Sequence, residues 1–388
     1  MRSQQDEIVD FTAAEAVLRI ERTSLRVQQP ATTPEMVSLA VGEPDFATPP
    51  RIIKAAADAL ANGLTHYSPQ LGEKPLLLAL AKLVSAQSGA EVGPGEILVT
   101  HGGTGGLSAA ILSIVNPGDR VVIPDPTYSL YADLVNMAGG VCVPVPCKEN
   151  LHWDLAALEQ AMQGARLFVF CNPSNPTGIV HTREEIEALG EIVKASDTLV
   201  VADEAYSDLV FTDQPFTSVL EVESFRGRTL YCQTFSKSYA MTGWRIGYLA
   251  GPARMIAAAA RVHNSVNSSV NTAVQYAALT AIEECAQDVR EMHKVYAERR
   301  ELMIAGLNAI PGLTLSNPEG AFYCFPSYSA PVSSVEMVGI LRGFGIAVRP
   351  GSEFGAAGES HIRLSYAASK ELIAEGLERL KRGLASLS

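Results

Sequence analysis

The sequence predicts an α/β protein in which a mostly parallel sheet is wrapped by helices and joined to a smaller α+β unit. Short strand-like segments alternate with helical ones, which is typical of a parallel sheet covered by helices. The strand segments are apolar throughout, as expected when both faces of a sheet are buried. The strand segments are 96–100, 120–124, 165–170, 198–206 and 228–236, and the helical segments between them include 105–115 and 184–196.

The chain has 388 residues, which is too long for one ordinary core, so we expect two domains. The large domain spans residues 45–285. A charged helical pattern over 281–307 predicts one long helix that leaves it. The small domain then comprises 1–44 and 286–388. We expect the N-terminal helix, predicted over 11–27, to pack on this small domain.

Composition and charge exclude several classes of protein. Hydrophobic residues make up 47% of the chain and charged residues 19%, which allows large buried cores. The net charge of −12 argues against nucleic-acid binding, which needs a basic face. No apolar run reaches the roughly 20 residues of a membrane span, and the N-terminus lacks the order of a signal peptide, so we expect a cytoplasmic protein. The six scattered cysteines form no C-x-x-C pair or His/Cys cluster, so we expect buried reduced thiols and no metal site.

The first candidate binding segment follows the strand at 96–100. Ligands of parallel α/β sheets bind beyond the carboxyl ends of the strands. The segment 101–106, HGGTGG, opens a helix there, and its glycines and free amides suit an anion. Taken alone, it is equally compatible with a tight strand-to-helix turn. A dinucleotide fingerprint starting at Gly103 fits poorly, because Ser108 would replace its third glycine.

Two further strands end in residues that carry chemistry. Asp203 ends one strand, and the next strand leads into Lys237, with Arg245 eight positions later. Alone, the carboxylate would be interpreted as a helix cap and the lysine as a surface charge. Together they supply an amine nucleophile, a carboxylate for a heteroaromatic nitrogen and an arginine for a phosphate. These are the needs of pyridoxal phosphate.

Four motifs resemble those of the class I/II pyridoxal-phosphate-dependent aminotransferases, and they occur in the family's order. The resemblance extends from about residue 41 to residue 369. It implies the type I transferase fold and a homodimer with shared active sites. It also implies a ping-pong enzyme that uses pyridoxal 5′-phosphate to move an amino group from an L-amino acid to a 2-oxo acid. The motifs are NPSNPTG at 172–178, ADEAY at 202–206, SKSYAMTGWRIGY at 236–248 and HIRLSY at 361–366.

The resemblance also implies roles for single residues. Lys237 holds the cofactor as a Schiff base and moves the substrate's α-proton. Asp203 pairs with the ring nitrogen. Tyr206 and Asn175 contact the ring 3-hydroxyl, and Asn175 also binds the substrate. Tyr128 stacks on the ring. The residues implied at the phosphate are Gly103, Thr104, Thr234, Ser236, Arg245 and, from the neighbouring subunit, Tyr67.

Arg363 resembles the arginine that binds the substrate carboxylate as a fork, a geometry that lysine cannot reproduce. Gly42 lets its backbone approach the same carboxylate. The family pattern also predicts cis peptide bonds before Pro126 and Pro176. In one departure, Leu77 stands where relatives commonly carry an arginine, and we interpret this position as structural.

Two alternatives and the specificity stay open at this stage. The same cofactor serves β-elimination and other lyase chemistry, and a non-catalytic effector module could bind it as well. We disfavour the module because no DNA-binding segment precedes the domain. The segment 261–279 offers no unambiguous second arginine for a dicarboxylate, with Arg261 and His263 as candidates. The sequence therefore leaves the donor and the acceptor unidentified.

Overall fold

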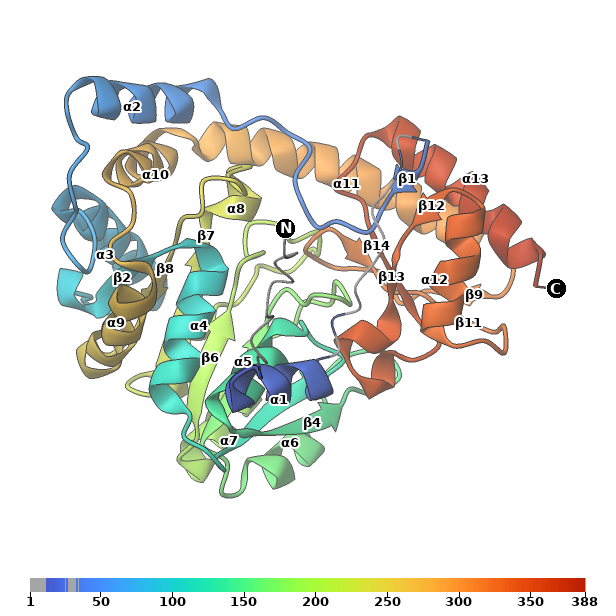
Figure 1. The fold of residues 1–388 in the computed structure, drawn as a ribbon, viewed down its shortest axis with the longest axis horizontal. Coiled ribbons are helices and arrows are strands. Elements are labelled where there is room, and N and C mark those ends of the chain that lie inside the picture. Colours follow the sequence, from blue (N-terminus) through green and yellow to red (C-terminus); the bar gives the residue numbers. More distant parts are fainter. Residues whose placement is uncertain (1–11, 25, 27–32, 34, 388) are drawn as a thin grey trace, which may run out of the picture.

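A seven-stranded sheet organises most of the chain in the computed structural model, which describes residues 12–24, 26, 33 and 35–387 (Figure 1). The strand order is β2-β8-β7-β6-β5-β3-β4, and β8 alone runs antiparallel to its neighbours. The predicted, mostly parallel sheet is thus confirmed. The strands are β2 (Ile97–Thr100), β3 (Arg120–Asp125), β4 (Val141–Pro146), β5 (Leu167–Cys171), β6 (Leu199–Asp203), β7 (Thr229–Thr234) and β8 (Gly247–Ala250).

The central strands are buried on both faces. In β5, Leu167 and Val169 belong to one apolar core, whereas Phe168 and Phe170 belong to the other. Successive side chains of a strand point to opposite faces, so a strand between two cores has no position for a polar residue. This explains why the strand segments are apolar throughout rather than alternating.

Helices cover both faces of the sheet, and local sequence sets where several of them begin and end. Thr182 and Glu185 form a capping box at the start of α7. Gly89 ends α3 in the left-handed conformation, with φ +63°. The helices are α2 (Pro50–Ala61), α3 (Lys74–Ser88), α4 (Gly102–Ile114), α5 (Leu130–Ala138), α6 (Leu155–Met162), α7 (Arg183–Ser196), α8 (Phe235–Ser238), α9 (Ala253–Asn267) and α10 (Thr272–Glu284).

A second region is built from the C-terminal part of the chain. Helix α11 (Ala286–Asn308) runs from the helices around the sheet to this region (Figure 1). Strand β1 (Val37–Ser38) pairs in parallel with β12, so an N-terminal segment joins it. The division at residue 285 stays a prediction. The other elements are β9 (Leu313–Thr314), β10 (Tyr323–Cys324), β11 (Ser327–Tyr328), α12 (Ser334–Gly343), β12 (Ile346–Ala347), β13 (Arg349–Pro350), β14 (Ile362–Ser365) and α13 (Lys370–Ala385).

The predicted position of the N-terminal helix is wrong. Helix α1 (Glu15–Thr23) packs on α5 beside the large sheet, not on the C-terminal region. Arg19 donates hydrogen bonds to the carbonyls of Asn136 (2.8 Å) and Met137 (3.0 Å) near the end of α5. Such carbonyls lack partners within their own helix, so a cation is stabilised there. Residues 11, 25 and 27 of the predicted helix lie outside the described residues.

The long helix predicted over 281–307 is confirmed as α11, but its predicted start is five residues too early. Helix α10 ends at Glu284 and α11 begins at Ala286, with Cys285 between them at φ −107° and ψ 18°. Cys285 is fully buried, so the chain changes direction there around a packed side chain. A periodic pattern cannot reveal such a break, because both helices keep an apolar face.

All six cysteines are free. Four of them are buried as predicted, but Cys142 and Cys147 are partly exposed. Within the described part of the chain, no helix combines the length and the apolar composition that crossing a bilayer requires.

Candidate active site

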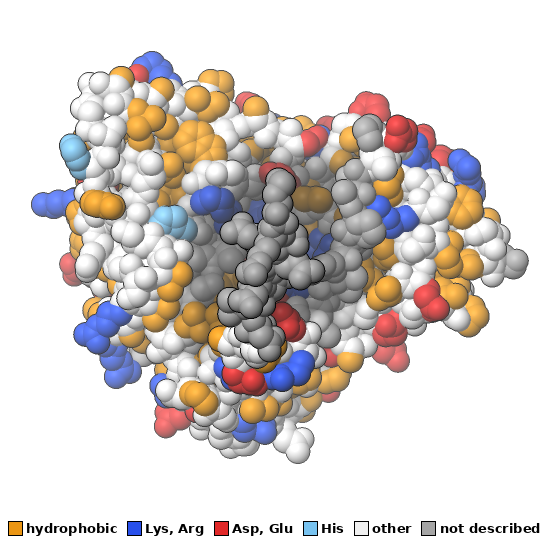
Figure 2. Space-filling view, viewed as in Figure 1, with side chains coloured by type: hydrophobic (Ala, Val, Ile, Leu, Met, Phe, Trp, Pro, Cys, Tyr) orange, Lys and Arg blue, Asp and Glu red, His pale blue; other side chains and the backbone are white. Residues whose placement is uncertain are grey.

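A cavity of about 480 Å³ opens at the carboxyl ends of β5, β6 and β7 and extends to the C-terminal region. Figure 2 shows the molecule hollowed between its two ends. All but one of the predicted site residues line this cavity, although they lie far apart in the sequence. They are Gly42, Gly103, Thr104, Tyr128, Asn175, Asp203, Tyr206, Thr234, Ser236, Lys237, Arg245 and Arg363.

Asp203 provides a buried carboxylate at the end of β6, with 6% of its surface exposed. Its Oδ2 accepts a hydrogen bond from the Tyr131 hydroxyl (2.8 Å), and its Oδ1 accepts one from the Ala205 amide (3.2 Å). Burial raises the pKa of Asp203, while the hydrogen bond from Tyr131 lowers it. A carboxylate so poorly solvated is well suited to pair with a cationic N–H group.

Lys237 lies on the short helix α8, directly after β7. Its Nζ donates a hydrogen bond to the Gly42 carbonyl (2.6 Å) and lies 5.8 and 5.5 Å from the ring centroids of Tyr206 and Phe322. Burial, followed by the charge of Arg363, lowers the pKa of Lys237 to about 8. A substantial fraction of the amine is therefore neutral near pH 8, and the neutral form is the nucleophile.

Donors for an anion gather at the start of α4. The first turn of the helix, residues 102–104, has backbone N–H groups without helical partners. The Arg245 guanidinium crosses this turn so closely that a Cβ on Gly102 would lie 2.7 Å from its Nη2. The hydroxyls of Thr234 and Ser236, 2.9 Å apart, lie on the same cavity wall. Amides, hydroxyls and a guanidinium together fit a phosphate dianion.

Arg363 on β14 provides a fixed guanidinium, with 7% of its surface exposed. Its Nη1 donates to Asn175 Oδ1 (2.9 Å), its Nη2 donates to the Ala40 carbonyl (2.7 Å), and its Cζ lies 4.4 Å from the centroid of the Tyr323 ring. The buried Nε has no hydrogen-bond partner among the described residues. A Cβ on Gly42 would lie 1.8 Å from the Tyr323 hydroxyl, so only glycine fits beside this arginine.

Several residues in or directly behind the cavity wall are absent from the sequence-based prediction. Tyr131, which does not line the cavity, donates a hydrogen bond to Asp203, and Tyr323 in the wall shares a hydrogen bond with the Tyr206 hydroxyl (2.9 Å). Both tyrosines lie within apolar segments, which are typical of a core, so no signal marked them. The other unpredicted polar and charged lining residues are Arg26, Glu43, Thr242, Arg349 and Glu353.

Tyr67 is the predicted site residue that does not line the cavity. Its side chain is 92% exposed and borders a separate surface pocket. Neither candidate for a second substrate contact lines the cavity either. Arg261 is exposed on α9, and His263 is buried with its Nε2 3.1 Å from His101 Nδ1.

The backbone agrees with the remaining expectations. The peptide bonds before Pro126 and Pro176 are cis, as predicted, and so is the bond before Pro173, which was not predicted. Leu77 is 8% exposed and packs in the core on one face of the large sheet, which agrees with its interpretation as a structural residue.

Comparisons with known proteins agree with this fold. The family model described as aminotransferase class I and II matches residues 34–380. An aspartate aminotransferase of Pyrococcus horikoshii is 33% identical over 96% of this chain and 97% of the relative. An aspartate aminotransferase of Streptomyces avermitilis is 36% identical over 89% of this chain and 88% of the relative. Enzymes of this family generally depend on pyridoxal phosphate.

Solved structures of such enzymes superpose along nearly the whole chain. An aromatic aminotransferase from Pyrococcus horikoshii has a TM-score of 0.89 at 34% identity, covering 96% of this chain and 99% of that one. An aspartate aminotransferase from Thermus thermophilus with maleate has a TM-score of 0.86 at 34% identity, covering 96% of this chain and 97% of that one. The chain therefore belongs to the aminotransferase class I and II family and is an enzyme that transfers an amino group from an amino acid to a 2-oxo acid.

Proposed function

We propose that Lys237 binds pyridoxal 5′-phosphate covalently and that amino transfer takes place in the 480 Å³ cavity. The observation that carries this proposal is the joint position of three groups in that cavity. An amine whose pKa is lowered to about 8, a buried carboxylate at Asp203 and the anion-binding start of α4 line the same space. No single one of these groups would define the cofactor.

The cavity residues fit this cofactor from one end to the other. The first turn of α4 and Arg245 would hold its phosphate, with Thr234 and Ser236 adding hydroxyls. Asp203 would pair with the ring nitrogen, and Tyr128 would stack on the ring. When bound, the cofactor supplies an aldehyde that takes up the amino group and a ring that withdraws electrons from the substrate α-carbon. Asn175 and Tyr206 would contact the ring hydroxyl.

Arg363 would bind the α-carboxylate of each substrate. Its Nη atoms are already fixed by Asn175 and Ala40 and each keeps a second N–H, so the guanidinium is positioned before the substrate arrives. Lys237 Nζ, once released by the substrate, would take the proton from the α-carbon. The lowered pKa suits this task, because a base must be neutral before it accepts a proton.

We further propose a homodimer in which Tyr67 reaches the cofactor phosphate of the partner subunit. An aromatic side chain that is 92% exposed in a single chain is well placed to be covered by a second copy. Sedimentation equilibrium tests the dimer.

Similar proteins carry the names aspartate aminotransferase and aromatic aminotransferase, so aspartate and an aromatic amino acid are the first donors to test.

The cofactor proposal is tested by spectroscopy and covalent trapping. Protein incubated with pyridoxal phosphate should gain visible absorption, lose it with an amino acid donor and regain it with a 2-oxo acid. Borohydride should fix the cofactor on Lys237, as located by peptide mass. The Lys237→Ala variant should lose both signals, while Lys82→Ala, at an exposed lysine of α3, should keep them.

The proposal fails if borohydride leaves Lys237 unmodified or if Lys237→Ala turns over amino acids at the wild-type rate. Ammonia released with a 2-oxo acid from a single substrate, without an acceptor, would instead indicate elimination as a competing reaction in the same cavity.

A further inference from the structure

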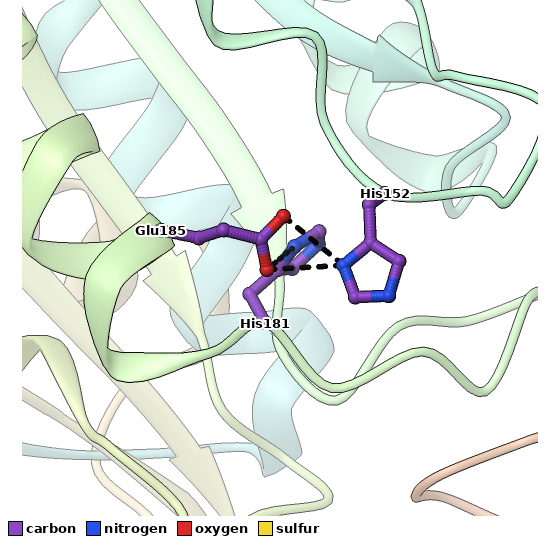
Figure 3. Close-up of side chains that lie close together, drawn as sticks. All are labelled: His152, His181 and Glu185. Atoms are coloured by element: carbon purple, nitrogen blue, oxygen red, sulfur yellow. Dashed lines mark hydrogen bonds and ion pairs between the residues drawn. The ribbon is translucent and has the colours of Figure 1, made fainter.

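A second group of reactive side chains lies away from the cavity. His152 lies between β4 and α6, His181 follows β5, and Glu185 lies in the first turn of α7 (Figure 3). Their potential ligand atoms all lie within 4.8 Å of one another, the one such group of three found among the described residues. None of the three lines the 480 Å³ cavity, so amino transfer does not explain their arrangement.

The distances within this cluster are close to those of a metal centre. His152 Nδ1 lies 3.0 Å from both oxygens of Glu185, and His181 Nδ1 lies 3.5 Å from Glu185 Oε2. Ligand atoms of a tetrahedral zinc ion, bound at about 2.0–2.1 Å, are about 3.4 Å apart. Small side-chain rotations would therefore bring the three atoms onto one ion.

His181 is the least expected member of the cluster. It is 3% exposed and stacked on Trp153, with ring centroids 3.4 Å apart. Its Nδ1 is buried and is directed toward Glu185 Oε2, 3.5 Å away, without a hydrogen bond of good geometry among the described residues (Figure 3).

An ordinary ion pair would explain only part of this arrangement. His152 and Glu185 form a close pair, whereas His181 Nδ1 stays 3.5 Å from Glu185 Oε2, at the limit of a hydrogen bond. A metal ion would satisfy all three groups at once.

The surroundings of His152 add a second feature of metal centres. Its other ring nitrogen, Nε2, faces Glu319 Oε2 at 3.9 Å. Histidines that bind metals through one nitrogen commonly direct the other toward a carboxylate. Glu319 is itself fixed, because it accepts a hydrogen bond from the Val180 amide (2.9 Å).

We propose that His152, His181 and Glu185 bind one divalent transition-metal ion of the zinc class, with water completing its coordination. Two imidazoles and one carboxylate favour Zn²⁺ or Co²⁺ over Mg²⁺ or Ca²⁺, which prefer oxygen ligands throughout. The side chains of His152 and Glu185 are each 17% exposed, which gives an ion access from solvent.

The test uses holoenzyme that has been treated with a chelator, desalted and titrated with Co²⁺ alone, followed by Zn²⁺ competition. Wild-type protein should bind one ion per chain, with visible absorption typical of a four-coordinate Co²⁺ site. His152→Ala and Glu185→Gln should each weaken binding by about 100-fold or more, because the first removes a ligand and the second removes the negative charge of another. Glu184→Gln changes a carboxylate in the same turn that is not a ligand, and should bind as wild type does.

Thermal unfolding provides a second readout that a purely structural cluster would not give. Zn²⁺ should raise the Tm of the wild type and of Glu184→Gln, but not that of His152→Ala. Because His152 is partly exposed, its variant should retain the wild-type circular dichroism spectrum. The proposal is overturned if the wild type binds less than half an equivalent, or if His152→Ala and Glu185→Gln bind the ion as tightly as the wild type.

Discussion

The variant Arg363→Lys tests the proposed carboxylate site sharply, because it keeps the positive charge and removes the fork. In the wild type, Nη1 and Nη2 each donate one N–H, to Asn175 and Ala40, and each keeps a second N–H for the substrate carboxylate. A lysine has one nitrogen at the end of a flexible chain. It cannot keep both protein contacts and also bind a carboxylate in a fixed direction.

The expected size of the effect follows from the lost contacts. At least one hydrogen bond to a charged group disappears, which contributes about 1.5–3 kcal/mol. Because about 1.36 kcal/mol corresponds to a factor of ten in rate, kcat/KM should fall about 10- to 150-fold. Amino acids and 2-oxo acids share the α-carboxylate, so both half-reactions should lose a similar factor.

Stopped-flow absorption of the bound cofactor measures each half-reaction separately. The matched control is Arg254→Lys, at an exposed arginine on α9 that does not line the cavity, and its kcat/KM should stay within about twofold of the wild type. The reasoning is refuted if Arg363→Lys keeps kcat/KM within about threefold of the wild type, or if only one half-reaction slows.

Two further variants test buried groups. Tyr131→Phe removes the hydrogen bond that lowers the pKa of Asp203. In this variant kcat should fall about tenfold, and the acidic limb of the pH profile of kcat should move to higher pH. An unmoved limb would contradict this positioning role of Tyr131. Burial raises the pKa of Glu204 from 4.5 to about 8. Between these values the folded state binds more protons than the unfolded state, so folding stability falls as pH rises. In Glu204→Gln this decrease of stability with pH is absent. Calorimetry should therefore show that the Tm of the variant minus that of the wild type is larger at pH 8 than at pH 5. Equal differences at the two pH values would contradict the raised pKa of Glu204.

The part of the site carried by the sheet could be predicted from sequence order alone. Asp203 ends β6, and Thr234 and Lys237 end or follow β7, which is the neighbouring strand. Neighbouring parallel strands end at the same edge of a sheet, so an α/β fold brings together the residues that follow these strands. Gly42 and Arg363 are different, because their meeting depends on how the C-terminal region folds back. They were predicted through family resemblance only.

The residues that were missed share a physical reason. Tyr131 and Tyr323 lie in apolar segments, and their hydroxyls matter only through partners distant in sequence. The cluster of His152, His181 and Glu185 comes from separate loops and a helix start. His181 and Glu185 lie four positions apart on one segment, but the third member, His152, lies on a different segment, so no single short motif contains all three groups.

The loop of residues 172–178 shows why a sequence motif can carry structural information beyond its local turn. Gly178 has φ +73°, and a Cβ there would lie 2.6 Å from the side chain of Pro318 and 2.8 Å from the Tyr323 carbonyl. Its own carbonyl accepts hydrogen bonds from the amides of Glu319 and Gly320, both 2.7 Å long. The glycine thus lets the loop close onto the C-terminal region. The same loop directs Asn175 at Arg363, the proposed substrate-binding arginine, so closure of the loop also helps to fix the position of that arginine.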